Sequence, residues 1–312
     1  MTYKILLTCP PMIGLKDEFT EIFAAAGFDV TVPDFTQIMP EERLIEVLPD
    51  YDGWIIGDDP ATRAVFEAGA AGKLKAVVKW GVGVDNVDFD ACKDLGLPVS
   101  NTPGVFGREV ADLAMHYTLA LARQTYEIDA GIRDGGWPKP SGVSLWNKKA
   151  GVIGAGDIGR NTIKRLLAHD LDVCTFDPFV DPASLPDGVV VRDWPEIGDL
   201  DFLVFTAPLT PETHHLFDMA ALEAAKSGMR LVNVGRGPVV QEAAVVAGLE
   251  SGKIHSAALD VFEIEPLPVE SALRGFGPRC LFGSHNGSNT RDAVTAVSEK
   301  AVGLLKGFLT AT

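Results

Sequence analysis

The 312-residue sequence contains few cysteines and no long apolar run. The four cysteines lie far apart and include no Cys-x-x-Cys pair, so we expect buried thiols in a reducing compartment. No run approaches the ~18 apolar residues of a membrane span. The apolar start at residues 5–7 meets Pro10 too soon for a signal peptide. These features predict a cytoplasmic protein with no membrane partner. The cysteines are Cys9, Cys92, Cys174 and Cys280.

Positive charge is also scarce. The chain has 27 Lys and Arg against 43 Asp and Glu, a net charge of −16, and no basic cluster offsets it. Such a chain would be repelled by a phosphate backbone, which argues against nucleic acid as a partner but leaves room for a small anionic substrate. With 46% hydrophobic residues, 32 Gly and 20 Pro, the composition is that of a folded globular protein. Its length predicts about two domains at roughly 150 residues each.

Short apolar runs alternate with helix-like stretches along most of the chain, a pattern typical of parallel sheets covered by helices. A long amphipathic helix starting near Arg108 separates two such series, and a final helical stretch at 292–309 has no strand after it. We therefore predict an α/β fold with two doubly wound parallel-sheet domains. The first series of strands is expected at 4–8, 29–32, 54–56, 76–79 and 98–100. The second is expected at 150–153, 172–176, 202–206, 230–234, 256–259 and 280–282.

A Gly-x-Gly-x-x-Gly motif follows the expected strand 150–153 and opens a helix. Gly154, Gly156 and Gly159 would permit a tight turn, close approach to a pyrophosphate and close helix packing. The alternative is a glycine-rich turn with no ligand. Asp177 ends the next strand, 21 residues after Gly156, where a carboxylate can bind both adenine-ribose hydroxyls and repel a 2′-phosphate. Together these features predict NAD rather than NADP. The loop also contains Asp157 and Ile158.

Three further strand ends carry reactive groups. His285 follows the strand at 280–282 among small polar residues, whereas the other five histidines are better explained by packing, capping, solvent exposure or the lack of an obvious partner. Arg236 lies in a glycine-flanked turn after a strand, where a guanidinium can bind a carboxylate bidentately, although a surface arginine is the alternative. One acid of a third strand end could orient His285. These acids are Asp260, Glu263 and Glu265.

Seven motifs in the same order resemble the D-2-hydroxyacid dehydrogenase family. They lie at 79–88, 101–104, the glycine loop with Asp177, 206–211, 233–237, 259–266 and 285–288. The resemblance implies a flavodoxin-like substrate domain made of residues 1–100 and 286–312, and a Rossmann NAD-binding domain at 101–285. It also implies a homodimer formed through the long helix and the arm at 137–146.

The resemblance implies a role for each matching residue. Arg236 would hold the substrate carboxylate, His285 would be the general acid/base, and Glu265 would pair with it. The backbone at Val82 and Gly83 would also bind the carboxylate. Oxidation of the 2-hydroxy acid would send a hydride from C2 to NAD and a proton to imidazole, with no metal. Further cofactor contacts are expected at Thr206, Ala207, Pro208, Val234, Gly235, Asp260 and His285.

Two departures bear on the substrate. Family members acting on 3-phosphoglycerate place an arginine after the third strand, where this chain has Gly57, Asp58 and Asp59. The acidic pair disfavours a phosphate, although Arg63 or Lys79 could compensate.

Asn286, beside His285, suggests a polar substrate tail, with a surface turn residue as the alternative. The leading prediction is an NAD-dependent dehydrogenase of small D-2-hydroxy acids. The alternatives are D-3-phosphoglycerate dehydrogenase of serine biosynthesis and an NAD-sensing corepressor-like binding protein. The complete set of reactive residues disfavours the binding protein.

Overall fold

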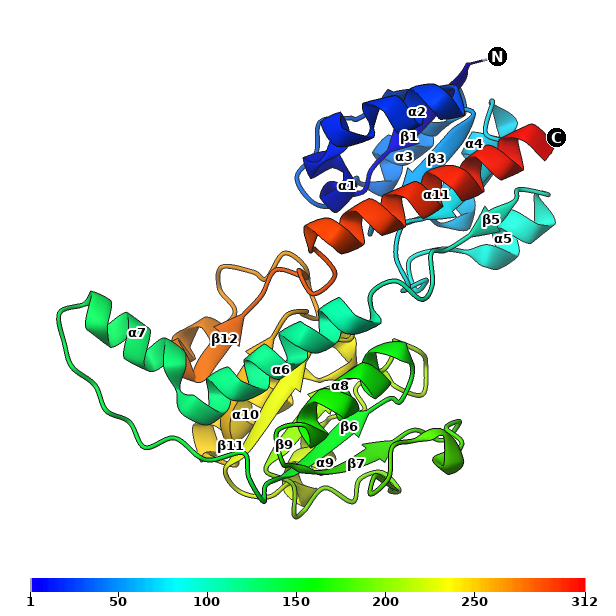
Figure 1. The fold of residues 1–312 in the computed structure, drawn as a ribbon. Helices are drawn as coiled ribbons and strands as arrows, with labels where there is room; N and C mark the ends of the chain where they lie inside the picture. The colour runs from blue at the N-terminus through cyan, green and yellow to red at the C-terminus, as the bar shows by residue number, and fades with distance from the viewer. Residues whose placement is uncertain (1, 312) are drawn as a thin grey trace. The chain divides into compact units, whose positions relative to one another are not determined.

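The computed structural model describes residues 2–311, which form two compact units (Figure 1). The first unit comprises the chain up to Val105 and from Asn289 onward, and the second comprises Phe106–Ser288. Each unit has one parallel sheet with helices packed on it. The predicted α/β class with two parallel-sheet domains is therefore confirmed.

The first unit has a five-stranded parallel sheet in the order β2-β1-β3-β4-β5. Every residue of β3 and β4 is buried, because helices cover both faces of the central strands. The strands are β1 Tyr3–Leu7, β2 Phe28–Thr31, β3 Gly53–Ile56, β4 Ala76–Lys79 and β5 Val99–Ser100. The helices are α1 Pro10–Gly14, α2 Thr20–Ala26, α3 Glu41–Val47, α4 Arg63–Ala71, α5 Phe89–Asp94 and α11 Arg291–Ala311, with 3₁₀ turns η1 Lys16–Phe19 and η2 Leu48–Asp50.

The C-terminal helix α11 is part of this first unit (Figure 1). The hydroxyl of Tyr3 donates to the carbonyl of Leu309 at 2.8 Å, and the indole N–H of Trp80 donates to Ser298 Oγ at 3.1 Å. Leu305 is fully buried against Gly53, where an added Cβ would lie 3.2 Å from its methyl groups. The helix thus packs on strands that lie more than two hundred residues earlier in the chain.

The second unit has a seven-stranded parallel sheet in the order β12-β11-β10-β9-β6-β7-β8. From β6 the sheet is extended on one side by β7 and β8, and on the other side by β9 to β12. Where the strand order reverses in this way, between β6 and β9, a crevice forms at the carboxyl ends of the strands. The strands are β6 Lys149–Ile153, β7 Asp172–Phe176, β8 Val190–Val191, β9 Phe202–Phe205, β10 Met229–Asn233, β11 Ile254–Leu259 and β12 Cys280–Phe282. The helices are α6 Gly107–Arg123, α7 Thr125–Arg133, α8 Asp157–Leu167, α9 Met219–Ala224 and α10 Glu242–Ser251, with 3₁₀ turns η3 Pro182–Ser184, η4 Gly237–Val239 and η5 Ala272–Arg279.

The cysteines are buried free thiols, as expected. Burial raises the pKa of the Cys92 thiol to about 12 and that of Cys174 to about 11, so neither is a ready nucleophile at neutral pH. Within residues 2–311, no helix has the length and apolar character needed to cross a membrane.

Candidate active site

The glycine loop joins β6 to α8 in a conformation that needs its glycines. Gly154 has a positive φ of 89°, and a Cβ there would lie 2.9 Å from Ala207 Cα. A Cβ at Gly159 would lie 2.0 Å from the carbonyl oxygen of Gly154, so α8 packs directly on the turn. At Gly156, by contrast, an added Cβ would meet no atom within 4 Å. Gly154 and Gly159 are therefore packed against the rest of the protein, whereas the side of the loop at Gly156 faces open space.

Asp177 follows β7 beside this loop, and its carboxylate binds two backbone groups. Oδ2 accepts from Ala155 N at 2.7 Å, and Oδ1 accepts from Phe179 N at 2.9 Å. Because the carboxylate bonds a residue inside the glycine loop, it fixes the two segments relative to each other. Phe179 itself is almost fully exposed next to it.

These residues fit a dinucleotide. The open face at Gly156 gives a pyrophosphate access to the backbone at the N-terminus of α8, an eleven-residue helix. Thr206 reinforces the loop, because its hydroxyl donates to the carbonyl of Gly154 at 2.8 Å. The partly exposed Asp177 carboxylate has the chemistry to bind ribose hydroxyls. Bound here, NAD would supply a hydride acceptor.

Arg236 lies in the turn between β10 and η4. Hydrogen bonds from Asn233 and close packing at Gly237 fix the conformation of this turn. Asn233, almost fully buried, accepts from Gly235 N at 3.1 Å and donates to the carbonyl of Arg236 at 3.0 Å. A Cβ at Gly237 would lie 1.8 Å from the carbonyl oxygen of Phe262, so no other residue fits between these loops. The guanidinium is half-buried, and its Nη1 donates to the carbonyl of Gly235 at 3.0 Å.

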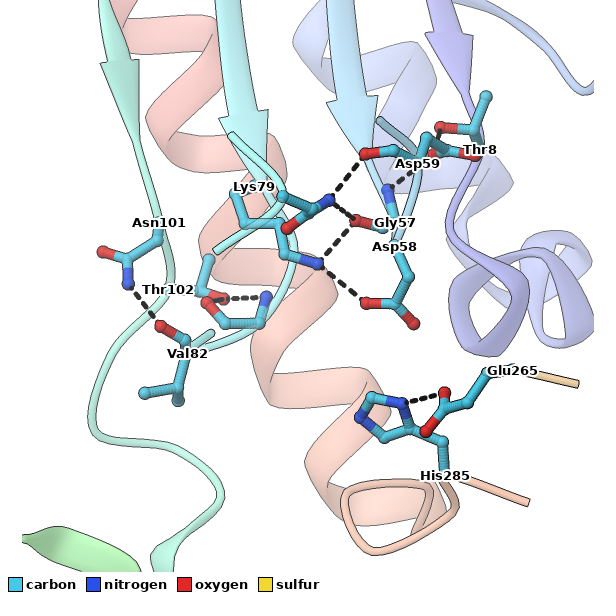
Figure 2. Close-up of polar contacts among 12 residues, drawn as sticks. Thr8, Gly57, Asp58, Asp59, Lys79, Val82, Asn101, Thr102, Glu265 and His285 are labelled. Carbon is cyan, nitrogen blue, oxygen red and sulfur yellow. Dashed lines mark hydrogen bonds and ion pairs between the residues drawn. The ribbon is translucent and has the colours of Figure 1, made fainter. Parts of the chain in front are cut away.

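His285 and Glu265 form a directly bonded pair, which Figure 2 shows as a dashed line. Nδ1 of His285 lies 2.8 Å from Oε2 of Glu265, and each side chain is 23% exposed. The other oxygen of Glu265 accepts from Phe262 N at 2.9 Å, which orients the carboxylate. A carboxylate at Nδ1 places a proton on that nitrogen, so neutral His285 has its lone pair on Nε2. This arrangement suits a general base that becomes a general acid once protonated.

Asp260 holds the loop that carries His285. Its side chain is 1% exposed and accepts from Gly287 N at 2.8 Å and from Asn286 N at 3.1 Å. Its own carbonyl accepts from His285 N at 2.7 Å, which keeps that residue at a positive φ of 54°. Burial raises the pKa of Asp260, against the opposing effect of the two N–H bonds. Asp260 thus positions the His285 loop through three hydrogen bonds.

The predicted residues of the first unit lie at the end of β4, where Lys79 is the last residue of the strand, and in the loop that follows it (Figure 2). Lys79, only 2% exposed, donates from Nζ to the carbonyl of Gly57 at 2.5 Å and to Asp58 Oδ1 at 3.1 Å. The carbonyl of Val82 accepts from the amide of Asn101 at 3.0 Å. The Val82 side chain is exposed and Gly83 is partly exposed. The loop is therefore fixed by hydrogen bonds at Lys79 and at the Val82 carbonyl, whereas the Val82 side chain and Gly83 are accessible to solvent.

Within the second unit, close contacts link the loops that carry the predicted residues. Ala207 contacts Gly154 on one side and Gly235 on the other, since a Cβ at Gly235 would lie 2.8 Å from the Ala207 carbonyl oxygen. Pro208 follows directly, and Val234 is buried just before Gly235. The predicted cofactor and catalytic residues of this unit thus share one edge of one sheet. Lys79, Val82 and Gly83 form a separate group in the first unit.

The sequence did not reveal a second histidine–glutamate pair. Nε2 of His215 lies 2.5 Å from Oε1 of Glu263, and the carboxylate of Glu242 accepts from Glu263 N at 2.9 Å. His215 adopts a positive φ of 51°, a turn conformation that spacing does not encode. Glu263 is thereby excluded as the partner of His285. No group of three or more His, Cys, Asp or Glu that could hold a metal ion occurs within residues 2–311.

Comparison with known proteins identifies the family. The profile of the D-isomer specific 2-hydroxyacid dehydrogenase, NAD binding domain, matches residues 115–287. The chain is 33% identical to a D-3-phosphoglycerate dehydrogenase of Methanocaldococcus jannaschii over 98% of its own length, but spans only 58% of that relative. It is 34% identical to a hydroxypyruvate reductase of Thermotoga maritima, with 73% of this chain and 74% of the relative covered.

A solved structure agrees with these matches. The apo D-lactate dehydrogenase of Escherichia coli has a TM-score of 0.85 and 28% identity, with 99% of this chain and 97% of that chain covered. The resemblance inferred from the sequence motifs is confirmed, as is NAD as the cofactor of the matched domain. The chain belongs to the D-isomer specific 2-hydroxyacid dehydrogenase family.

Proposed function

We propose that this protein is an NAD-dependent oxidoreductase that interconverts a small D-2-hydroxy acid and its 2-oxo acid. The observation that carries the proposal is the His285–Glu265 pair, bonded at 2.8 Å in the same unit as the glycine loop and Asp177. An acid/base and a dinucleotide loop on one sheet edge are what hydride transfer at a hydroxyl-bearing carbon requires.

His285 moves the proton in this proposal. In the oxidation direction Nε2 takes the proton of the 2-hydroxyl, and the imidazolium so formed is stabilised by the Glu265 carboxylate at Nδ1. In the reduction direction the same nitrogen returns the proton to the carbonyl oxygen. Asp260 keeps the His285 loop in place during both steps through its bonds to Asn286 and Gly287.

Arg236 binds the substrate carboxylate in this proposal, since a guanidinium matches it bidentately. The backbone at Val82 and Gly83 is the second carboxylate contact, and Lys79 and Asn286 complete the proposed substrate set. The cofactor set is the glycine loop with Asp157 and Ile158, together with Asp177, residues 206–208, Val234, Gly235 and Asp260. We assign substrate binding to the discontinuous first unit and NAD to the second.

The test is reduction of a panel of 2-oxo acids by NADH, with the configuration of the product determined. Turnover giving the D-hydroxy acid supports the proposal. NADH binding without turnover of any acid would overturn it and favour a corepressor-like binding protein.

A second candidate, D-3-phosphoglycerate dehydrogenase, is favoured by one observation. Several relatives carry that name, including two that match 98% of this chain, which spans 58% of each of them. The same assay separates the two candidates, because it compares phosphorylated and unphosphorylated acids side by side.

We also propose a cytoplasmic homodimer formed through the long helix α6 and the arm at 137–146, with α7 lying between them in the chain. α7 has no buried residue, and the arm exposes Trp137 by 77% and Trp146 by 66%. Large exposed apolar side chains gathered on one segment are typical of protein interfaces. A monomer mass in light scattering would contradict this proposal.

A further inference from the structure

Glu265 lies in a loop that has no regular secondary structure of its own. Between β11 and η5, residues 260–271 form neither helix nor strand, and Ile264 in this loop is 65% exposed. A loop with few buried contacts is easily displaced, and a shift of about 1 Å in a catalytic group can cost about 10²-fold in rate. The position of Glu265 against His285 therefore depends on contacts between this loop and other parts of the second unit.

Within this loop, Glu263 bonds two other segments of the unit. Its Oε1 lies 2.5 Å from Nε2 of His215, and its Oε2 accepts from Glu242 N at 3.3 Å. Glu263 N donates in turn to Oε1 of Glu242 at 2.9 Å, so the two glutamates bind each other's backbone. Glu242 is the first residue of α10, where the helix dipole favours a carboxylate. The side chains of His215 and Glu263 are only 33% and 29% exposed, which limits screening by solvent.

His215 is itself fixed by the backbone around it. Its N–H donates to the carbonyl of Pro238 at 2.7 Å. Two residues later, the carbonyl of the fully buried Phe217 accepts from Gln241 N at 2.9 Å. This segment thus lies along the stretch of chain between η4 and α10. The imidazole of His215 is therefore a fixed partner, to which Glu263 ties its own loop.

Two residues separate Glu263 from the carboxylate that bonds His285 (Figure 2). Phe262, just before Glu263, donates its N–H to Oε1 of Glu265 at 2.9 Å. That bond orients the carboxylate, but it lies inside the loop and cannot attach the loop to its surroundings. The buried Phe262 ring packs against Phe282 of β12, with centroids 5.9 Å apart, which holds one side of the loop. Glu263 holds the other side.

We propose that Glu263 is a positioning residue for the proton transfer, which holds Glu265 against Nδ1 of His285 by tying their loop to His215 and to α10. This inference rests on the proposed function and adds a residue to the same site. Both oxygens of the Glu263 carboxylate bond protein groups, so its effect on the reaction passes through Glu265. Asp260 has the corresponding role for the loop of His285, since it bonds the two backbone N–H groups that follow the histidine.

The test is a double-mutant cycle on Glu263→Ala and Glu265→Gln, which measures the single-turnover rate of NADH oxidation at saturating 2-oxo acid. The acid is the one that the wild type reduces fastest in a panel that includes glyoxylate, pyruvate and hydroxypyruvate. Glu263→Ala alone should slow this step by about 10- to 100-fold. In the Glu265→Gln background it should slow the step by less than about twofold, because the contact that it positions is already lost. KM for the acid should stay within about twofold of the wild type, since Asn233 holds the Arg236 turn independently.

Glu250→Ala is the matched control, because Glu250 is an exposed glutamate of the same helix α10. It should leave the single-turnover rate and KM unchanged. Titration with NADH counts the folded sites in each variant, so a loss of folded protein is not mistaken for a slower step. If Glu263→Ala does not fold, Glu263→Gln takes its place, since the amide keeps one acceptor. A smaller loss of rate is then expected, with the same dependence on Glu265.

The outcomes separate this inference from the proposed function. Equal slowing by Glu263→Ala in both backgrounds would overturn the inference and leave the dehydrogenase intact, because the two residues would then act independently. A wild-type rate in a folded Glu263 variant, or an effect confined to KM, would overturn it as well. Failure of the wild type to reduce any 2-oxo acid of the panel would overturn the proposed function, and this inference with it.

Discussion

Replacing Asp177 with alanine tests the proposed choice of NAD over NADP. In the structure this carboxylate bonds the backbone of Ala155 and Phe179, and it is partly exposed at the end of β7. A 2′-phosphate placed where the carboxylate binds ribose hydroxyls would meet its negative charge directly.

The size of the effect follows from Coulomb's law. Two unit charges about 4 Å apart interact by about 1 kcal/mol in water. A phosphate monoester carries about −1.5 to −2 charges at neutral pH. Because Asp177 is partly exposed, the value for water applies, and the repulsion amounts to about 2 kcal/mol or about 30-fold in affinity. Asp177→Ala should therefore raise NADPH affinity relative to NADH affinity by about 30-fold.

Fluorescence titration of the reduced cofactors gives both dissociation constants. The absolute affinity for NADH should fall as well, because two hydrogen bonds to the ribose are lost. Asp177→Asn separates charge from geometry, since the amide keeps an acceptor for Ala155 N. Asp181→Ala is the control, because this carboxylate caps η3 instead, through Ala183 N at 3.0 Å. An NADH-to-NADPH ratio within twofold of the wild type in Asp177→Ala would refute the reasoning.

Three further predictions concern catalysis and stability. Arg236→Ala should lower kcat/KM by about 10²- to 10⁴-fold, since two charge-assisted bonds of about 1.5–3 kcal/mol each are lost, with NADH binding unchanged; wild-type kinetics would remove Arg236 from the site. Glu265→Gln should lower kcat by about 10²-fold, because the amide cannot stabilise a charged His285; an unaltered kcat in steady-state assays would contradict the pairing. Hydrogen bonds from Arg192, which has the larger effect, and from Lys149 hold the pKa of Asp199 below its usual range. Its contribution to stability is therefore full above the unfolded pKa of 3.8 and is lost progressively as the pH falls from there through the lower pKa of the folded state. Urea unfolding should show Asp199→Asn less stable than the wild type at pH 7, with a smaller difference at pH 2.5, and a difference that stays constant with pH would contradict this assignment.

Most of the fold could be predicted because its core strands are continuous apolar runs. The predicted strand at 172–176 and the helix after Gly156 coincide with β7 and α8, since a buried strand and a glycine turn leave clear local signals. The two-residue strand β8 was missed, because Val190–Val191 is held by pairing with β7 and not by a pattern of its own.

Less of the candidate site than of the fold could be predicted from the sequence. The spacing in the sequence left three acids as possible partners of His285. Only the course of the backbone in the folded structure shows which of them contacts His285. Asp260 turns inward to backbone N–H groups, Glu263 binds His215, and Glu265 bonds His285. Both histidines of these pairs, His215 and His285, adopt a positive φ. This backbone conformation is uncommon for residues other than glycine, so the sequence does not predict it.

The position of α11 also bears on how the chain is synthesised. Residues up to Val105 form most of the first unit, yet the helix that buries Leu305 against them follows only after the whole second unit. At about 5–20 residues per second, the ribosome needs roughly 10–40 s to make the intervening and final segments. During that interval the nascent first sheet lacks its cover, and Phe106–Ser288 can fold first. A ribosome-stalled fragment ending before α11 should therefore bind chaperones through the first segment, and release from them should coincide with the emergence of the last helix.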